Sequence, residues 1–104
     1  MDVRRHPVFD RWLRGLRDPR ALARILLRIE RCAEGNFGDH KSVGQGVHEL
    51  RIDYGPGYRV YFVQRGVQVV ILLCGGDKSS QQRDVDLAHK LAGELKEWPD
   101  DTRF

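Results

Sequence analysis

The residues most able to do chemistry in this sequence lie in a predicted β-hairpin over positions 47–63. Apolar and polar residues alternate on both sides of a Gly-Pro-Gly turn, which is typical of two antiparallel strands. In the expected register, Arg51 lies opposite Arg59. Two residues further out on the same face, Glu49 lies opposite Tyr61. Facing arginines destabilise a sheet unless an anion lies between them, and a phosphate is the natural candidate. The plainer alternative is a surface cluster that Glu49 neutralises.

Composition and length limit what such a patch can belong to. The 104 residues fit one domain, spanning 1–104, with a single modest core. The net charge is +3, and 32% of the residues are charged, as in ordinary globular proteins. No apolar run approaches the roughly 20 residues that cross a bilayer, so we expect a cytoplasmic protein without membrane contact. Cys32 and Cys74 lack metal-ligand spacing, and we expect reduced packing thiols and no metal or cofactor.

The first half of the chain predicts helices. Residues 1–5 are expected to form an edge strand, followed by a helix over residues 7–15. An aspartate cap before Pro19 begins a second helix, which ends near Gly35 and forms an antiparallel hairpin with the first. Residues 35–46 have no apolar period and include four glycines, so they are predicted to form a surface loop.

The second half predicts a sheet and a last helix. Strands at about 47–52, 58–64 and 67–74 form an antiparallel meander, in which the third strand is apolar on both faces and therefore central. The strand with the arginines lies nearer an edge. A Ser-x-x-Gln capping box starts a helix over residues 79–98, which Pro99 ends. The order (β)ααβββα predicts an α+β fold: an antiparallel sheet of three to four strands, packed with an N-terminal helical hairpin and a C-terminal helix.

Arginines recur every three or four residues along the two N-terminal helices. This spacing places most of them on the solvated side of the helices. Such a stripe suits a phosphate-rich surface, and it is equally typical of an ordinary arginine-rich amphipathic helix. The members are Arg11, Arg14, Arg17, Arg20, Arg24, Arg28 and Arg31.

Several blocks of the sequence resemble one known family. They are Gly35-Asn-Phe-Gly-Asp-His-Lys41, Glu49-Leu-Arg-Ile52, Gly55-Pro-Gly-Tyr-Arg-Val-Tyr-Phe62 and Leu72-Leu-Cys-Gly-Gly-Asp-Lys-Ser-Ser-Gln81. Together they resemble the RelE/HigB toxins of type II toxin–antitoxin systems. Within these toxins the chain is most similar to the addiction-module killer proteins, the Gp49-like branch of the RelE/ParE superfamily. The similarity spans nearly the whole chain and implies a RelE-like fold.

The resemblance also implies a site. Arg59 matches the arginine with which RNA-cleaving relatives hold the scissile phosphate, and Arg51 falls where several relatives have a basic residue. Lys41 and Lys78 correspond approximately to basic residues before the first hairpin strand and after the last strand. Each would be a further phosphate contact, although on its own each is an ordinary solvated loop lysine.

The implied reaction is attack of a ribose 2′-hydroxyl on the adjacent phosphorus, which leaves a cyclic phosphate and a 5′-hydroxyl without a metal. Arg51, Arg59 and Lys78 would stabilise the developing charge. Some relatives have a catalytic Tyr or His near the C-terminal end, where this chain reads Gln81-Gln82-Arg83-Asp84. The general base therefore stays open. The candidates are Glu49, which we favour although it is more simply a partner that neutralises Arg51, and Asp39, Asp77, Asp84 or a lysine of lowered pKa.

Three more residues are candidates for contact with RNA. His40, in the predicted loop, is free to reach a substrate, whereas His48 lies on the apolar face and is expected to be structural. Tyr61 shares a face with Arg59 and could stack on a base or simply pack across the strands. Gln81, in the region where relatives have a catalytic residue, is the third candidate.

Three functions remain open. The first is a ribosome-dependent endoribonuclease, or mRNA interferase, that inhibits translation. The second is a ParE-like inhibitor of DNA gyrase acting through a docking surface such as the helical hairpin, and the third is an inactive or regulatory relative. The family implies a cognate antitoxin, often with a helix-turn-helix domain, and DNA contact only through it. The ribosome and mRNA would be the other partners. The modest charge predicts weak binding to free RNA.

Overall fold

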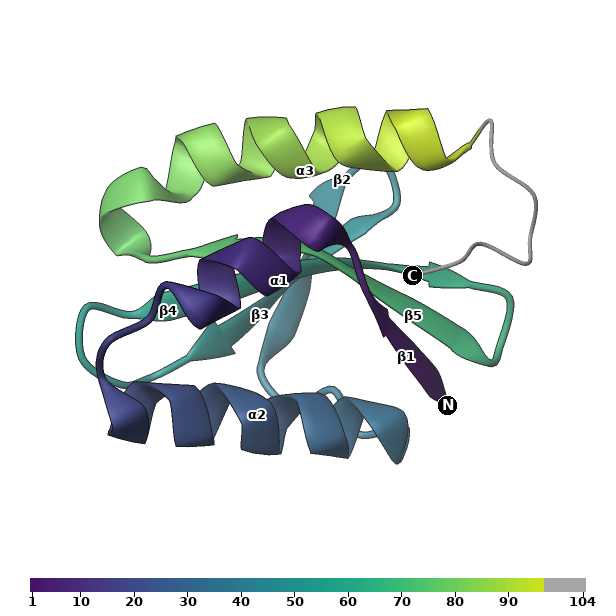
Figure 1. The fold of residues 1–104 in the computed structure, drawn as a ribbon. Helices are drawn as coiled ribbons and strands as arrows, with labels where there is room; N and C mark the ends of the chain where they lie inside the picture. The colour runs from purple at the N-terminus through teal and green to yellow at the C-terminus, as the bar shows by residue number, and fades with distance from the viewer. Residues whose placement is uncertain (97–104) are drawn as a thin grey trace.

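Five strands form one mixed sheet in the order β1-β5-β4-β3-β2 (Figure 1). The computed structural model describes residues 1–96. Along the chain the elements are β1 (Asp2–Arg5), α1 (Pro7–Arg14), α2 (Pro19–Ala33), β2 (His40–Gly44), β3 (Val47–Ile52), β4 (Tyr58–Arg65), β5 (Val69–Gly76), the short 3-10 helix η1 (Lys78–Ser80) and α3 (Gln81–Leu95). The predicted α+β class is confirmed. The predicted end of the last helix, at Trp98 before Pro99, lies outside the described residues.

The two edges of the sheet differ from the prediction of a three- to four-stranded antiparallel meander. β1 pairs with β5 in parallel, so the sheet is mixed. β2 lies inside the predicted loop over residues 35–46 and pairs antiparallel with β3. This edge strand is exposed at nearly every position, so no apolar alternation marks it in the sequence. β5 is buried on both faces, as predicted, but it is not the middle strand, because it lies between the edge strand β1 and β4. β4, which carries Arg59, is the middle strand, so the prediction that the arginine strand lies nearer an edge is wrong for β4.

The N-terminal helices begin where the sequence predicts. The Asp18 carboxylate accepts hydrogen bonds from the backbone N–H groups of Arg20 and Ala21 and so caps α2. α1 and α2 run in opposite directions (Figure 1). α1 packs mainly along β5, beyond the point where β1 ends, and α2 covers one face of the sheet.

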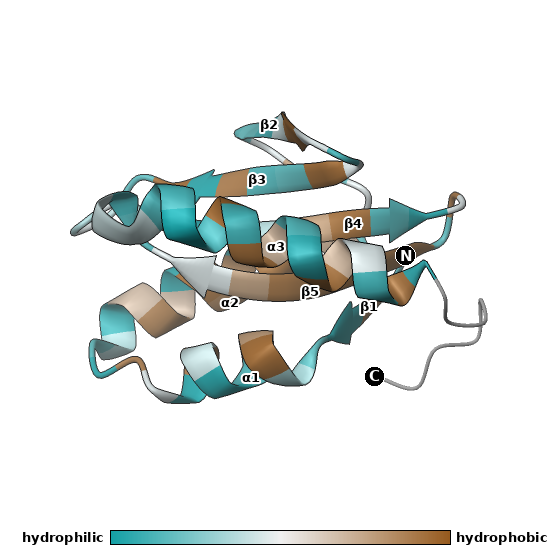
Figure 2. Ribbon diagram, turned by 90° about the horizontal axis from the view of Figure 1, so that it is seen from above, coloured by the Kyte–Doolittle hydropathy of each residue, from teal (hydrophilic) through white to brown (hydrophobic). Residues whose placement is uncertain are grey.

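Apolar side chains form one cluster on each face of the sheet. Figure 2 shows apolar residues along β4 and β5, and a mixture of polar and apolar residues along α3, which crosses in front of the sheet. On the face of α1 and α2 the buried members are Phe9, Leu13, Ile25, Ile29, Cys32, Leu50, Ile52, Val60, Phe62, Val70 and Leu72. On the face of α3 they are Val47, Tyr61, Ile71, Leu73, Cys74, Ala88, Leu91, Ala92 and Leu95. Both thiols are free and buried. Among residues 1–96, no helix is both long and apolar enough to span a membrane.

Candidate functional site

The hairpin of β3 and β4 has the predicted register. Arg51 pairs with Arg59, and Glu49 pairs with Tyr61. Tyr61 belongs to the cluster under α3, and residues directly opposite each other or two apart in a sheet share a face. All four side chains therefore lie on the α3 side of the sheet, and the predicted grouping is confirmed.

A pocket of about 360 Å³ opens where this hairpin turns. Its cationic side chains are Arg51 of β3, Arg59 of β4 and Lys78 of η1. The remaining lining residues are Asp39, Asp53, Gly55, Pro56 and Gly57. Three positive charges from separate elements thus lie around one small cavity with two carboxylates, and such cations are the usual partners of an anion such as a phosphate.

Arg59 is held from behind by a buried carboxylate. Only 9% of Arg59 is exposed, and its Nε lies 3.7 Å from Oε1 of the fully buried Glu49. Its one hydrogen bond to the described residues is a long one, 3.4 Å, to the carbonyl of Tyr58. The guanidinium therefore keeps most of its donors available to a ligand in the pocket.

Glu49 also receives two hydrogen bonds under α3. Its Oε2 accepts from the hydroxyl of Tyr61 at 3.0 Å and from the side-chain amide of Gln81 at 2.9 Å. Burial, and then the adjacent Glu49 carboxylate, raise the pKa of Tyr61 far above its usual range, so the phenol stays a neutral donor. Glu49, Tyr61 and Gln81 thus form a connected polar network behind Arg59.

Two expectations about this face are wrong. The alternative of a surface cluster is wrong, because Glu49 and Tyr61 are fully buried beneath α3. Of the two roles left open for Tyr61, packing is confirmed, and its ring has no free face to stack on a base. Glu49 was expected, if structural, to neutralise Arg51, yet its cationic partner is Arg59. The alternating pattern of the hairpin determines which of its side chains share a face. It does not show that Gln81, from a helix distant in the sequence, covers Glu49 on that face.

Arg51 has its own carboxylate partner. Its side chain is 35% exposed and lies 3.1 Å from Oδ1 of Asp39. The segment carrying Asp39 is held by Arg28 of α2, which donates to the carbonyls of Phe37, Asp39 and Arg51. Arg28, one of the regularly spaced arginines of the N-terminal helices, therefore has a structural role: its hydrogen bonds hold the segment of Asp39 beside β3. No motif in the sequence signals this role, because its partners are backbone carbonyls.

Lys78 is placed by a cap at the end of β5. The Asp77 carboxylate accepts from the backbone N–H of Ser79 at 2.8 Å and from its hydroxyl, and these bonds lower the pKa of Asp77. The capping box joins Asp77 and Ser80, two residues before the position predicted. A Cβ at Gly57 would lie 3.3 Å from Cγ of Lys78, so the lysine crosses closely over the hairpin turn.

The sequence of the chain is similar to known proteins. Residues 11–92 match the model of a family described as phage-derived protein Gp49-like (DUF891). The chain belongs to the Gp49-like family. This is a toxin-type family of the RelE superfamily, associated with toxin–antitoxin systems. A protein of Haemophilus influenzae named only as uncharacterized is 56% identical over 87 residues, which cover 84% of this chain and 88% of that protein.

The two remaining residues predicted to contact RNA lie on opposite faces of the Gp49-like sheet. Lys41 is exposed and lies opposite Glu49, so it shares the face of the pocket at the edge strand. His40 lies opposite Leu50, on the α2 side, with its ring 5.5 Å from that of Phe37. The structure thus places Lys41 on the face of the candidate site, although Lys41 is not a lining residue of the pocket, and it does not bring His40 to that face. His48 is half-buried on the same side as His40, as predicted.

The candidate bases differ in their access to the pocket. Asp39 lines it, together with Asp53, which the sequence reasoning did not single out. Asp84 is buried and bonded to the hydroxyl of Ser80, and Asp77 serves as a cap. Within residues 1–96, no group of three or more His, Cys, Asp or Glu side chains is arranged to hold a metal ion.

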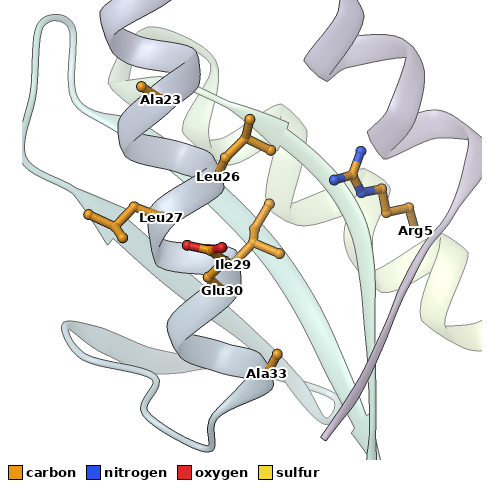
Figure 3. A pocket seen from close by; sticks show the side chains of 7 residues that line it. All are labelled: Arg5, Ala23, Leu26, Leu27, Ile29, Glu30 and Ala33. Atoms are coloured by element: carbon orange, nitrogen blue, oxygen red, sulfur yellow. The ribbon is translucent and has the colours of Figure 1, made fainter.

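A larger hollow on α2 has a different character. It measures about 640 Å³, and Figure 3 shows aliphatic side chains of α2 along it with Arg5 on the opposite side. Its lining residues are Arg5, Ala23, Leu26, Leu27, Ile29, Glu30 and Ala33. This hollow lacks the convergent positive charge of the pocket beside Arg59, so it is not the candidate reaction site of this Gp49-like protein.

Proposed function

We propose that this chain is the RelE/HigB-type toxin of a type II toxin–antitoxin pair and cleaves mRNA on the ribosome without a metal. The observation that supports the proposal is the convergence of Arg51, Arg59 and Lys78 on one pocket. The Gp49-like family membership supplies the toxin context. The phosphodiester to be cut binds in this pocket, with Arg59 as its principal contact.

The pocket favours the transition state over the bound substrate. The non-bridging oxygens of the phosphoryl group gain charge as the fifth bond to phosphorus forms, and fixed cations stabilise that charge. The planar guanidinium of Arg59 can give two parallel N–H donors to such oxygens, which a lysine at that position could not match. Because Glu49 holds Arg59 from behind, little reorientation is needed during the reaction.

Proton transfer is assigned to groups that line the pocket. The 2′-oxygen bonds to phosphorus while the bond from phosphorus to the 5′-oxygen breaks. Asp39 takes the proton of the 2′-hydroxyl, since Glu49 is fully buried and its Oε2 already accepts two hydrogen bonds. Lys78 gives a proton to the leaving 5′-oxygen, because the only other proton donors among the lining side chains are arginines, which do not deprotonate in proteins.

The partners follow from this activity. A cognate antitoxin, carrying a helix-turn-helix domain, covers the pocket or blocks entry into the ribosome. DNA contact takes place only through the antitoxin. The target is translated mRNA in the cytoplasm, and the modest net charge makes the isolated toxin a weak binder of free RNA.

The proposal is tested by expressing wild type, Arg51→Ala and Arg59→Lys in a bacterial host. New 5′ ends on mRNA and gyrase-dependent supercoiling are measured in the same cells. Loss of an oxyanion donor costs about 100-fold or more in rate, so each variant should reduce in-frame cleavage by about two orders of magnitude. Arg20→Ala, at an exposed position of α2, is the matched control and should cleave like wild type.

Thermal melting of each purified variant separates loss of the site from loss of the fold. Cleavage that persists in both pocket variants would contradict the phosphate assignment. Growth arrest with intact messages and impaired supercoiling would instead make the protein a ParE-like gyrase inhibitor.

A further inference from the structure

A second hollow lies next to the pocket, between the edge strand β2 and the beginning of α3. It measures about 640 Å³. Val43 of β2 and Val85 of α3 give it apolar walls, and Gln82 and His89 add polar groups. Of its lining side chains, only Lys78 takes part directly in the reaction proposed above.

A β-bulge builds one wall of the hollow. Ser42 pairs with His48 and Gly44 pairs with Val47, so Val43 has no partner on β3. A bulge of this kind re-aims a side chain, often beside a functional site. Nε2 of His89 lies 2.9 Å from the carbonyl oxygen of Val43 and must be the donor, because a carbonyl only accepts. This bond ties α3 to the bulge and holds the two walls together.

Lys78 connects the hollow to the phosphate pocket. It lines both cavities, so their mouths meet at its side chain. Lys41 lies on the same face of the edge strand. A ligand that fills both cavities needs an anionic group beside a group that offers apolar surface to the two valines and hydrogen-bonding atoms to the polar lining residues. Single-stranded nucleic acid has this alternation of phosphate and base.

We propose that this hollow is a subsite for the unpaired nucleobase next to the phosphate bound by Arg59. The inference rests on the proposed function and extends it to the recognition of sequence. The valine side chains contact the faces of the base, and the amide of Gln82 reads its edge.

The orientation of the Gln82 amide supports this role. Its Nε2 donates to Oδ1 of Asp86 at 3.1 Å, and an ionised carboxylate only accepts, so the oxygen and nitrogen positions of the amide are fixed. One N–H and the carbonyl oxygen of the amide remain for a ligand. A neighbouring donor and acceptor on a side-chain amide form the pair that reads base edges.

The test compares the sequences at the cut sites of wild type, Gln82→Ala and Gln64→Ala, mapped transcriptome-wide from new 5′ ends. Gln64 is exposed on β4, away from both cavities, and is the matched control. We expect wild type and Gln64→Ala to share a base preference at one position beside the cut. Gln82→Ala should weaken that preference about tenfold, the usual value of one base-edge contact, whereas Gln64→Ala should also keep the total cleavage of wild type.

Several outcomes would overturn the subsite. The first is an unchanged preference in Gln82→Ala. The second is a uniform loss of cleavage at all sites, with an unaltered melting temperature. The third is a wild-type enzyme that cuts without any base preference. In these cases cleavage by wild type leaves the proposed function standing. Absence of cleavage by wild type would overturn the proposed function, and the subsite with it.

Discussion

Glu49 and Arg59 form a buried ion pair whose members depend on each other. A buried charge without its partner costs about 3–5 kcal/mol, far more than an exposed pair contributes. Glu49 is fully buried and Arg59 is 9% exposed, with 3.7 Å between Oε1 and Nε. The same contact that orients Arg59 toward the pocket therefore also stabilises the fold, and substitutions here affect both.

Glu49→Gln tests whether Glu49 is an anchor or a base. As an anchor, its neutralisation should lower the free energy of unfolding by about 3 kcal/mol, because Arg59 loses its counterion. Arg59→Met should cost a similar amount, and the double variant should cost clearly less than the sum of the two. Urea denaturation measures all three. Strictly additive losses would contradict the ion pair.

The kinetics of Glu49→Gln provide the second readout. A positioning residue affects the rate at every pH, whereas loss of a general base removes one limb of the pH–rate profile. For Glu49→Gln we expect a lower cleavage rate with a pH–rate profile of unchanged shape. Asp39→Asn, at the pocket itself, should flatten the limb that reports the base.

The residue-level prediction from sequence was strong within the hairpin and weak beyond it. Alternation and the Gly-Pro-Gly turn predicted the pairing of Arg51 with Arg59 and of Glu49 with Tyr61 correctly. Glu49 is fully buried, and one of its hydrogen-bond partners there, Gln81, lies 32 positions away. Side chains that meet only through tertiary packing leave no periodic signal, so the degree of burial could not be predicted.

At the scale of elements, the junction of β5 and α3 positions both cavities. A bulge at Leu73 lets Leu73 and Cys74 both join the cluster under α3, so Gly76 faces α3 as well. A Cβ on Gly76 would overlap the carboxylate of Asp84, and one on Gly75 would overlap the indole of Trp12. The two glycines thus allow α1 and α3 to approach the strand from opposite sides.

Gly76→Ala should therefore destabilise the protein. Overpacking costs about 1–3 kcal/mol, and here the added methyl displaces a buried carboxylate that is bonded to Ser80. Gly93→Ala is the matched control, because Gly93 lies in α3 with open space around its Cα. The control should raise stability by up to about 1 kcal/mol. Thermal or urea melting measures both, and equal stability of Gly76→Ala and wild type would contradict the close approach.

The elements themselves show where sequence patterns fail. α2 was predicted closely because Asp18 and Pro19 form a standard start. β2 was missed because an edge strand with exposed residues has the polarity and glycine content of a loop. The parallel pairing of β1 was not predicted either, since four residues carry no information on their partner or direction.

On the scale of the whole molecule, β5 joins the two apolar clusters. Val70 and Leu72 belong to the cluster under α1 and α2, whereas Ile71 and Leu73 belong to the cluster under α3. Removal of the helices from either face would expose side chains of β5 to water. We therefore expect the two faces to unfold together as one cooperative unit.

The two cysteines allow this cooperativity to be measured, because one thiol lies on each face of the sheet. Cys32 lies in the cluster under α2 and Cys74 in the cluster under α3. Burial raises the pKa of the Cys32 thiol, and burial followed by the charge of Asp84 raises the pKa of Cys74 to about 12. Since the thiolate is the reactive form, both thiols should be inert at pH 8 in the folded protein.

Alkylation followed by mass spectrometry should thus find both cysteines labelled at one common rate, set by global unfolding. That rate should be at least about a thousandfold below the rate in urea, as expected for a domain with 5 kcal/mol or more of stability. Sub-denaturing urea should accelerate both sites equally. Faster labelling of Cys74 alone would mean that α3 detaches while the rest stays folded. In that case Gln81 would leave Glu49, and the network that holds Arg59 would be open for part of the time.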